Sequence, residues 1–138
     1  MSNIFDNGPA PTVVSVEAMT LENENYRSTL WTGEHLQMTL MAIQPGHDIG
    51  LEVHPDTDQF LRIEQGTAKV SIGLDKDNLQ TWTASDAYGI FVPAGHWHNL
   101  ESIGDQALKV YSIYAPSHHP HGTVHITKED AEAAEASE

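Results

Sequence analysis

Short hydrophobic runs, each ended by turn-forming residues, make up most of the chain from Gln37 onward. The runs are rich in β-branched, aliphatic and aromatic residues and are bounded by Gly, Pro, Asp or Asn, which is typical of an all-β sandwich or barrel. The pattern lacks the alternation of strands with long helices that a parallel α/β sheet would need. Eight strands are predicted, over Gln37–Ile43, Leu51–His54, Gln59–Ile63, Thr67–Ile72, Leu79–Trp82, Ile90–Val92, His98–Ile103 and Ala107–Tyr114.

The two ends of the chain have a different pattern. Pro9 and Pro11 lie among polar residues, and we expect an N-terminal arm here with an edge strand over Thr12–Val16. Near the other end, Thr127 and Asp130 have the spacing of a capping box, which predicts a short acidic helix. These features divide the chain into an arm over residues 1–35, a barrel over 36–116, and a His-rich loop with an acidic tail over 117–138.

Composition narrows the function classes. A chain of 138 residues fits one domain with one core. It contains no cysteine, which excludes disulfides, Cys-ligated zinc, iron–sulfur clusters and thiol nucleophiles. Six Lys and Arg against 20 Asp and Glu disfavour nucleic acid and anionic membrane surfaces as partners. The sequence shows neither a signal-peptide pattern nor an apolar run of membrane-spanning length, so we expect a cytoplasmic protein.

Three side chains that can bind a metal ion lie at defined intervals between two glycines. The order is Gly46, five residues, Glu52, one residue, His54, four residues, Gln59, six residues, Gly66. Residues two apart on a strand point to the same side, so Glu52 and His54 present a carboxylate and an imidazole together. The turn that follows sends the chain back, and Gln59 begins the returning strand beside them with its side chain directed into the barrel.

His98 is expected to reach the same place from a distant strand. The tight corner Pro93-Ala94-Gly95 precedes it and lets the next strand re-enter the barrel with the imidazole directed inward. Imidazole and carboxylate are ligands that borderline divalent metals prefer, and nine histidines occur in this acidic chain. Glu52, His54, Gln59 and His98 are therefore candidate ligands for one divalent metal ion, either manganese, iron, nickel or zinc, and the resemblance given next implies that they hold it together.

The first stretch resembles the first motif of the cupin superfamily. That motif reads Gly, five residues, His, one residue, His, three or four residues, Glu, six residues, Gly. Here Glu52 stands at the first His position and Gln59 at the Glu position. The set still offers two imidazoles, one carboxylate and one further oxygen donor, which can fill four positions of an octahedron and leave two for water or substrate.

The second stretch resembles the second cupin motif. Pro93, Gly95 and His98 match it, whereas Ala87 and Ser102 replace a Gly and an Asn that are not ligands in the family. The resemblance extends over most of the chain and implies a single cupin (jelly-roll-like) β-barrel, similar to small single-domain bacterial cupins labelled mannose-6-phosphate isomerase-like. Cupins often pair through edge strands, so we expect a homodimer in which the arm supplies an exchanged strand; the alternative is that the arm covers an edge.

Several assignments stay open at this point. Asp56 could pair with His54 in place of Glu52, although it would then fall outside the family spacing. The four candidate ligands could also be ordinary polar residues of a barrel that binds no metal, and His96 could lie at the rim of the pocket. A C-terminal cluster could form a second metal site or a loop folded back over the barrel; its members are His118, His119, His121 and His125.

The resemblance implies a metal-dependent enzyme acting on a small, unphosphorylated, oxygen-bearing molecule, of the isomerase, lyase or dioxygenase type. A sugar-phosphate isomerase is an alternative that the scarcity of cations weakens, because Arg27 and Arg62 are the two arginines that could grip a phosphate. A non-catalytic cupin that binds a metal or a small molecule is the other alternative, since one fold hosts many functions. Catalysis would also need a proton-transfer residue, for which the candidates are Tyr111, Tyr114, His96 and Glu64.

Overall fold

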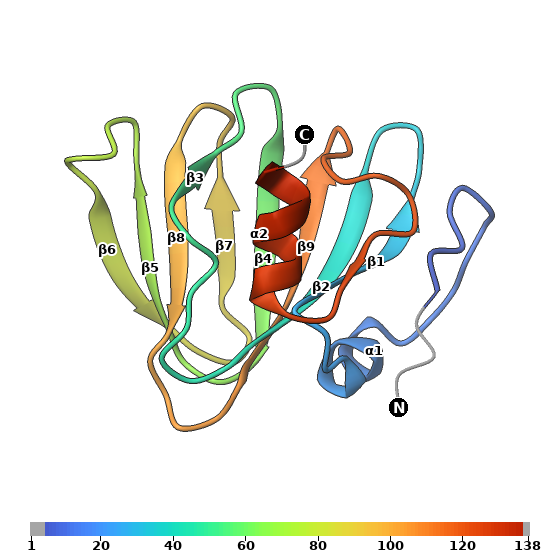
Figure 1. The fold of residues 1–138 in the computed structure, drawn as a ribbon, viewed down its shortest axis with the longest axis horizontal. Coiled ribbons are helices and arrows are strands. Elements are labelled where there is room, and N and C mark those ends of the chain that lie inside the picture. Colours follow the sequence, from blue (N-terminus) through green and yellow to red (C-terminus); the bar gives the residue numbers. More distant parts are fainter. Residues whose placement is uncertain (1–4, 137–138) are drawn as a thin grey trace.

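The computed structural model describes residues 5–136, which form two antiparallel sheets and two helices (Figure 1). The strands are β1 (Arg27–Thr32), β2 (Gln37–Ile43), β3 (Glu52–Val53), β4 (Asp58–Gln65), β5 (Ala68–Gly73), β6 (Gln80–Ala84), β7 (Gly89–Val92), β8 (Trp97–Ser102), β9 (Leu108–Ala115) and β10 (Val124–His125). The helices are α1 (Val16–Glu22) and α2 (Lys128–Ala136). The six-stranded sheet has the order β10-β1-β2-β9-β4-β7, and the four-stranded sheet has the order β3-β8-β5-β6. The predicted all-β, jelly-roll-like barrel with a short C-terminal helix is confirmed.

All eight predicted strands have counterparts, and β2 has the predicted bounds. Two further strands, β1 and β10, come from segments that the sequence analysis assigns to the arm and to the His-rich loop. They pair with each other, with Arg27 opposite His125, and β1 also pairs with β2. The first four residues of β1 are all buried, and β10 has only two residues, so neither strand shows the alternation that reveals a strand from sequence.

The prediction of an edge strand over Thr12–Val16 is wrong. The structure has no strand there, and helix α1 begins at Val16. The Ser15 side chain accepts a hydrogen bond from the Ala18 N–H at 3.3 Å and caps the first turn of α1. The helix packs against β2, β4 and β9, and Lys109 Nζ donates to the carbonyl oxygen of Asn23 at the helix C-cap. A helix forms because its capping serine and its contact with the sheet outweigh the strand preference of the preceding residues.

The interior of the barrel has a polar end and an apolar end. Antiparallel register aligns the inward-facing residues of β2, β9 and β4 in rows across the six-stranded sheet. These residues are buried, so the polar rows need internal partners, while the aliphatic rows belong to the core. From the polar end inward, the rows are Gln37, Tyr114 and Gln59; then Thr39, Ser112 and Leu61; then Met41, Val110 and Ile63.

The C-terminal helix is held by its cap and by the core. Thr127 Oγ1 accepts a hydrogen bond from the Asp130 N–H at 3.1 Å, and Asp130 Oδ2 accepts one from the Thr127 N–H at 3.3 Å, which is the predicted capping box. Ala131 is 2% exposed and joins the hydrophobic core, while Lys128 pairs with Asp48. Neither helix in the described part of the chain is long and apolar enough to cross a membrane.

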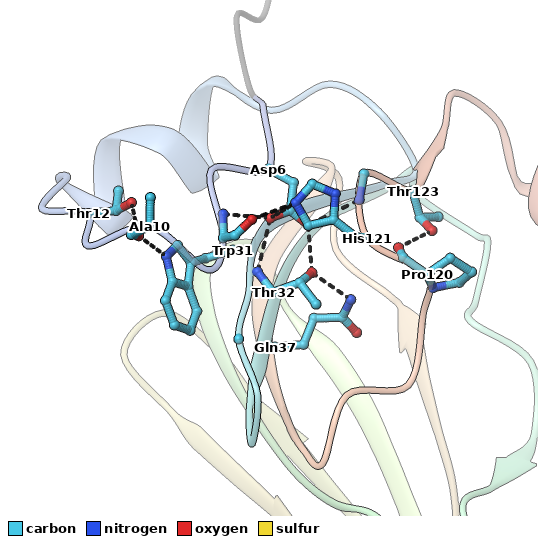
Figure 2. A network of polar contacts seen from close by, with 12 residues as sticks. Asp6, Ala10, Thr12, Trp31, Thr32, Gln37, Pro120, His121 and Thr123 are labelled. Carbon is cyan, nitrogen blue, oxygen red and sulfur yellow. Dashed lines mark hydrogen bonds and ion pairs between the residues drawn. The ribbon is translucent and has the colours of Figure 1, made fainter.

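The N-terminal arm is tied to its own chain through Asp6 (Figure 2). The Asp6 carboxylate accepts hydrogen bonds from the N–H groups of Gly8 at 3.0 Å, Thr32 at 2.9 Å and Gly122 at 3.1 Å. Further along the arm, the carbonyl of Ala10 accepts a hydrogen bond from Trp31 Nε1 at 2.7 Å. The arm therefore fastens the end of β1 to the His-rich loop.

The backbone at Ala87 predicts a stabilising substitution. Ala87 has a φ of +74°, a region that favours glycine, in a turn where the Tyr88 N–H bonds to the Ser85 carbonyl. We expect Ala87→Gly to raise the free energy of unfolding by up to about 1 kcal/mol, because the side chain is exposed and relief of backbone strain exceeds the added chain entropy. Urea denaturation measures the change. The control Ala94→Gly, at a residue without a positive φ, should be neutral or destabilising; equal effects at both positions would contradict the explanation.

The Asp6 contacts predict an acid-sensitive contribution to stability. Burial alone would raise the pKa of Asp6, but hydrogen bonds from Thr32, Gly122 and Gly8 outweigh burial and hold the pKa below its ordinary value of 3.8. The stabilisation is therefore complete above pH 3.8 and is lost as the pH falls through the lower folded-state pKa. We expect Asp6→Asn to lower the free energy of unfolding at pH 7 by about 2 kcal/mol and to flatten its fall with acid. Denaturation curves from pH 7 to strongly acidic pH measure both effects. The control Asp105→Asn, at an exposed site, should have the same free energy of unfolding as the original protein at each pH.

Candidate metal centre

Glu52, His54 and His98 come from one edge of the four-stranded sheet. Glu52 on β3 lies directly opposite His98 on β8, and directly opposed residues point to the same face. His54 follows Glu52 by two residues and shares that direction. The Gly95 N–H donates to the His54 carbonyl at 2.9 Å, and the Gly95 φ of +82° makes the corner that returns the chain into β8. This hydrogen bond joins the corner before β8 to the segment that carries His54.

The three side chains converge closely. One ligand atom from each lies within 4.8 Å of the others. Glu52 Oε1 is 3.5 Å from His54 Nε2 and 3.7 Å from His98 Nε2, separations longer than a normal hydrogen bond. Both Nε2 atoms are buried, and within the described chain neither has a hydrogen-bond partner. Polar atoms in this state cost free energy unless a proton or a cation satisfies them, so the arrangement fits a divalent metal ion.

The backbone orients His98. Its Nδ1 lies 3.2 Å from the carbonyl oxygen of His96, and a carbonyl can only accept, so Nδ1 carries the hydrogen. In the neutral ring the lone pair is then on Nε2, the atom that faces Glu52. Hydrogen bonds of this kind fix the ring orientation of metal-binding histidines. The backbone carbonyl of His96 thus orients the His98 ring.

Glu52 is ionised in this position. Burial alone would raise the pKa of its carboxyl, but interactions with His54 and His98 outweigh burial and hold the pKa well below its ordinary value. The Glu52 side chain is 24% exposed, whereas those of His54 and His98 are 6% and 0% exposed. One carboxylate and two imidazoles form a ligand set that divalent first-row metals accept.

Gln59 faces the interior from the opposite sheet. It is 4% exposed and lies opposite Tyr114 in the polar row described above. Its Nε2 donates to Ser112 Oγ at 3.3 Å, while its Oε1 is buried and accepts no hydrogen bond from the described residues. An amide oxygen left in this way needs a donor or a cation, which makes it a candidate fourth ligand.

Several other candidates lie outside the centre. Asp56 is exposed in the turn after β3, and the converging group of the described chain does not include it. Tyr111 packs against Phe60, and Glu64 pairs with Arg62, at positions that alternate with the inward-facing residues of β9 and β4. Two of the four proton-transfer candidates from the sequence are therefore on the outer face of the six-stranded sheet.

Two histidines of the C-terminal cluster lie beside the centre. The ring centroids of His118 and His54 are 4.0 Å apart, and Tyr114 is 5.5 Å from His118 and 5.9 Å from His54. His119 packs edge-on against Tyr114 at 5.4 Å. The sequence leaves open whether this cluster forms a second metal site or a loop folded back over the barrel. The structure has the loop folded back over the barrel. The number of histidines between residues 118 and 125 is the one sequence signal for this contact. Their spacing does not predict that His118 packs on His54.

Burial controls the protonation of the groups around the centre. It raises the pKa of Tyr114 to about 12, so this side chain is a neutral phenol at physiological pH. Burial also lowers the pKa of His119 to about 2, with the positive charge of Arg27 adding to the effect. His119 is therefore a neutral imidazole, and its buried Nε2 has no hydrogen-bond partner among the described residues.

Comparison with known families decides the identity of the fold. Residues 39–114, more than half of the chain, match the Cupin_2 family, described as a cupin domain. The chain belongs to the cupin family. This cupin is 54% identical over 131 residues to the uncharacterized protein YrkC of Bacillus subtilis (strain 168), which covers 94% of this chain and 70% of that protein.

Solved structures share the fold. The crystal structure of BH2720 from Bacillus halodurans matches this cupin with a TM-score of 0.93 and 54% identity, over 94% of this chain and 99% of that one. Oxalate decarboxylase from Bacillus subtilis, a protein with Mn(II) centres, matches with a TM-score of 0.58 and 23% identity, over 63% of this chain and 23% of that one. The likeness to the decarboxylase shows the fold alone.

Metal binding should stabilise the protein through this centre. After treatment with a chelator, we expect Mn²⁺ or Zn²⁺ at 100 times its dissociation constant to raise the free energy of unfolding by about 2.7 kcal/mol, because the folded state alone presents the assembled ligands. Urea denaturation with and without the ion measures the gain. Glu52→Ala and His98→Ala should lose it, whereas His35→Ala, at a residue whose side chain is 87% exposed, should keep it. An undiminished gain in His98→Ala would place the ion elsewhere.

Proposed function

We propose that this cupin holds one divalent metal ion and acts on a small, unphosphorylated, oxygen-bearing molecule. The observation that carries the proposal is the convergence of two buried imidazole nitrogens, neither hydrogen-bonded to a described residue, on one carboxylate. A divalent cation would satisfy all three groups at once. The proposed ligands are Glu52, His54, Gln59 and His98.

Gln59 is the proposed fourth ligand because its amide oxygen accepts no hydrogen bond from the described residues. The hydrogen bond from Gln59 Nε2 to Ser112 Oγ directs the nitrogen away and leaves Oε1 available. Four ligands would leave two positions of an octahedron for water or substrate. Two imidazoles together with oxygen donors suit manganese, iron, nickel and zinc comparably, so all four metals stay among the candidates.

The charge of this ligand set supports Lewis-acid chemistry. Glu52 supplies the one formal negative charge among the four proposed ligands, so a divalent ion would keep a net positive character. When bound, such an ion polarises a substrate oxygen or lowers the pKa of a water molecule. Tyr114, a neutral phenol packed against His54, could donate a hydrogen bond to a substrate oxygen.

The positions of the two arginines support an unphosphorylated substrate. Arg62 pairs with Glu64 on the outer face of the six-stranded sheet. Arg27 is 2% exposed, and its Nη1 lies 3.2 Å from His125 Nδ1. The Arg62 side chain is 42% exposed but lies on the outer face, away from the centre, and Arg27 is buried, so neither presents an exposed guanidinium fork at the centre to a phosphate dianion. A sugar-phosphate isomerase is therefore the weakest of the candidate functions.

The reaction would be of the isomerase, lyase or dioxygenase type, because one barrel hosts all of these chemistries. Oxalate decarboxylase, among the solved structures with this fold, has Mn(II) centres. Small carboxylates with manganese are accordingly the first combination to test, and hydroxyl and carbonyl compounds come next.

A non-catalytic binding cupin is the second candidate, and one observation favours it. Tyr111 and Glu64 are on the outer face, and burial raises the pKa of Tyr114 to about 12, far from the neutral range in which acid–base catalysts work best. His96 is then the candidate left for proton transfer. A binding module would need the metal but no proton-transfer group.

Elemental analysis and a substrate panel test the proposal. The protein is purified without a histidine tag, its bound metal is measured, and turnover is assayed with small carboxylates, hydroxyl and carbonyl compounds and one sugar phosphate. We expect one metal ion per chain and turnover of an unphosphorylated compound that disappears with chelator and in His98→Ala. His35→Ala is the matched control and should retain both metal and turnover.

The outcomes separate the candidates. Bound metal without turnover across the panel would select the binding module. Turnover of the sugar phosphate alone would overturn the substrate class. A protein that takes up none of the four metals, even on reconstitution, would overturn both the enzyme and the metal-binding module.

A further inference from the structure

We propose that the segment Ser117–Thr123, here called the histidine cover, closes one side of the metal centre and that His118 is a positioning residue that slows release of the ion. The inference rests on the proposed metal function. It concerns a part of the chain beyond the family match, which ends at residue 114. Ring contacts with His54 and two sets of hydrogen bonds support it.

The first support is the packing of His118 on His54. Their ring centroids are 4.0 Å apart with the planes tilted by 53°, and Tyr114 completes a triangle of rings with both. His118, which is exposed to solvent, also contacts His119, with ring centroids 4.7 Å apart. The His54 side chain is 6% exposed and its ring is packed by the rings of His98, Tyr114 and His118, so it cannot leave its rotamer until a neighbour moves. Release of a chelated ion requires each ligand to swing away in turn, so His118 would retard the step at His54.

The second support is the clamp formed by Gln37, which is 0% exposed. Gln37 Oε1 accepts hydrogen bonds from the N–H groups of His118 at 3.1 Å and His119 at 2.9 Å. Its Nε2 donates to the His119 carbonyl at 2.7 Å and to Thr32 Oγ1 at 2.9 Å. These four bonds use the full capacity of the amide, so the backbone that carries His118 has a defined position over the barrel.

The third support is the Asp6 network, which holds the far end of the histidine cover (Figure 2). Asp6 accepts a hydrogen bond from the Gly122 N–H at 3.1 Å, and its carboxylate lies 3.3 Å from His121 Nε2. The same His121 nitrogen donates to the Gly8 carbonyl at 2.7 Å. The histidine cover is thus fastened at both ends, to β2 through Gln37 and to the N-terminal arm through Asp6.

His118 would act through His54 and not as a ligand. The converging group in the described chain consists of Glu52, His54 and His98, without His118. Removing the His118 ring should therefore change the rate at which the ion leaves and leave its coordination unchanged. This separation between rate and coordination makes the inference testable.

The experiment measures Zn²⁺ release into an excess of a chromogenic chelator from the full chain and its variants. We expect release to be at least tenfold faster in His118→Ala and in Gln37→Ala. His118→Phe, which keeps an aromatic ring against His54, should release Zn²⁺ at close to the original rate. His35→Ala is the control for loss of a histidine and should not differ from the original protein.

The absorption spectrum of bound Co²⁺ provides a readout that a general loss of stability would not move. We expect the same ligand-field bands in the original protein, His118→Ala and His118→Phe, because none of the ligands changes. Unchanged Zn²⁺ release in His118→Ala would overturn the inference. So would a changed Co²⁺ spectrum with fast release from both His118 variants, since that result would make His118 a ligand.

Failure of the proposed function would look different. A protein that binds neither Zn²⁺ nor Co²⁺ would refute the metal centre itself and the histidine cover with it. A protein that binds both ions at Glu52, His54 and His98, but releases them equally fast with and without the His118 ring, would refute the cover alone. If Gln37→Ala does not fold, the comparison of His118→Ala with His118→Phe still decides the question.

Discussion

A carboxylate and two buried imidazole nitrogens that meet at one point need a proton or a cation between them, and the surrounding structure prepares the three groups for it. Glu52 remains ionised beside His54 and His98 although burial opposes the charge. The backbone of His96 holds the His98 hydrogen on the far nitrogen, so the near nitrogen keeps its lone pair for a cation. Without a proton or a cation, two buried nitrogens would go unsatisfied, which is costly in a barrel of this size.

Strand register explains why this centre lies at one end of the barrel. The row that contains Gln37, Tyr114 and Gln59 faces the ligands from the other sheet, and the rows beyond it turn aliphatic. Polar groups are thereby gathered where they can satisfy one another, a metal or a small molecule. The aliphatic rows supply the core that stabilises the fold. One sheet thus combines the support of the candidate metal centre with the burial of apolar surface.

The two ends of the chain complete the centre although neither belongs to the family match. The N-terminal arm carries Asp6, and the segment after β9 carries His118 and His119. Gln37 and Asp6 join these segments through hydrogen bonds that span more than 80 residues of sequence. The barrel thereby acquires a covering from two segments that lie outside the residues matched by the family.

The sequence by itself determined the local pattern: the eight central strands, the placing of Glu52 beside His54, the inward face of β4 at Gln59, and the capping box at Thr127. Each depends on residues close together in the chain, whose periodicity and turn chemistry act over a few positions. It did not determine α1, where a single capping serine competed with β-branched neighbours. Only the tertiary structure decided that Tyr114 faces the centre while Tyr111 faces outward, and that His118 rests on His54. Those outcomes depend on strand pairing and on hydrogen bonds between distant segments, which local sequence patterns do not encode.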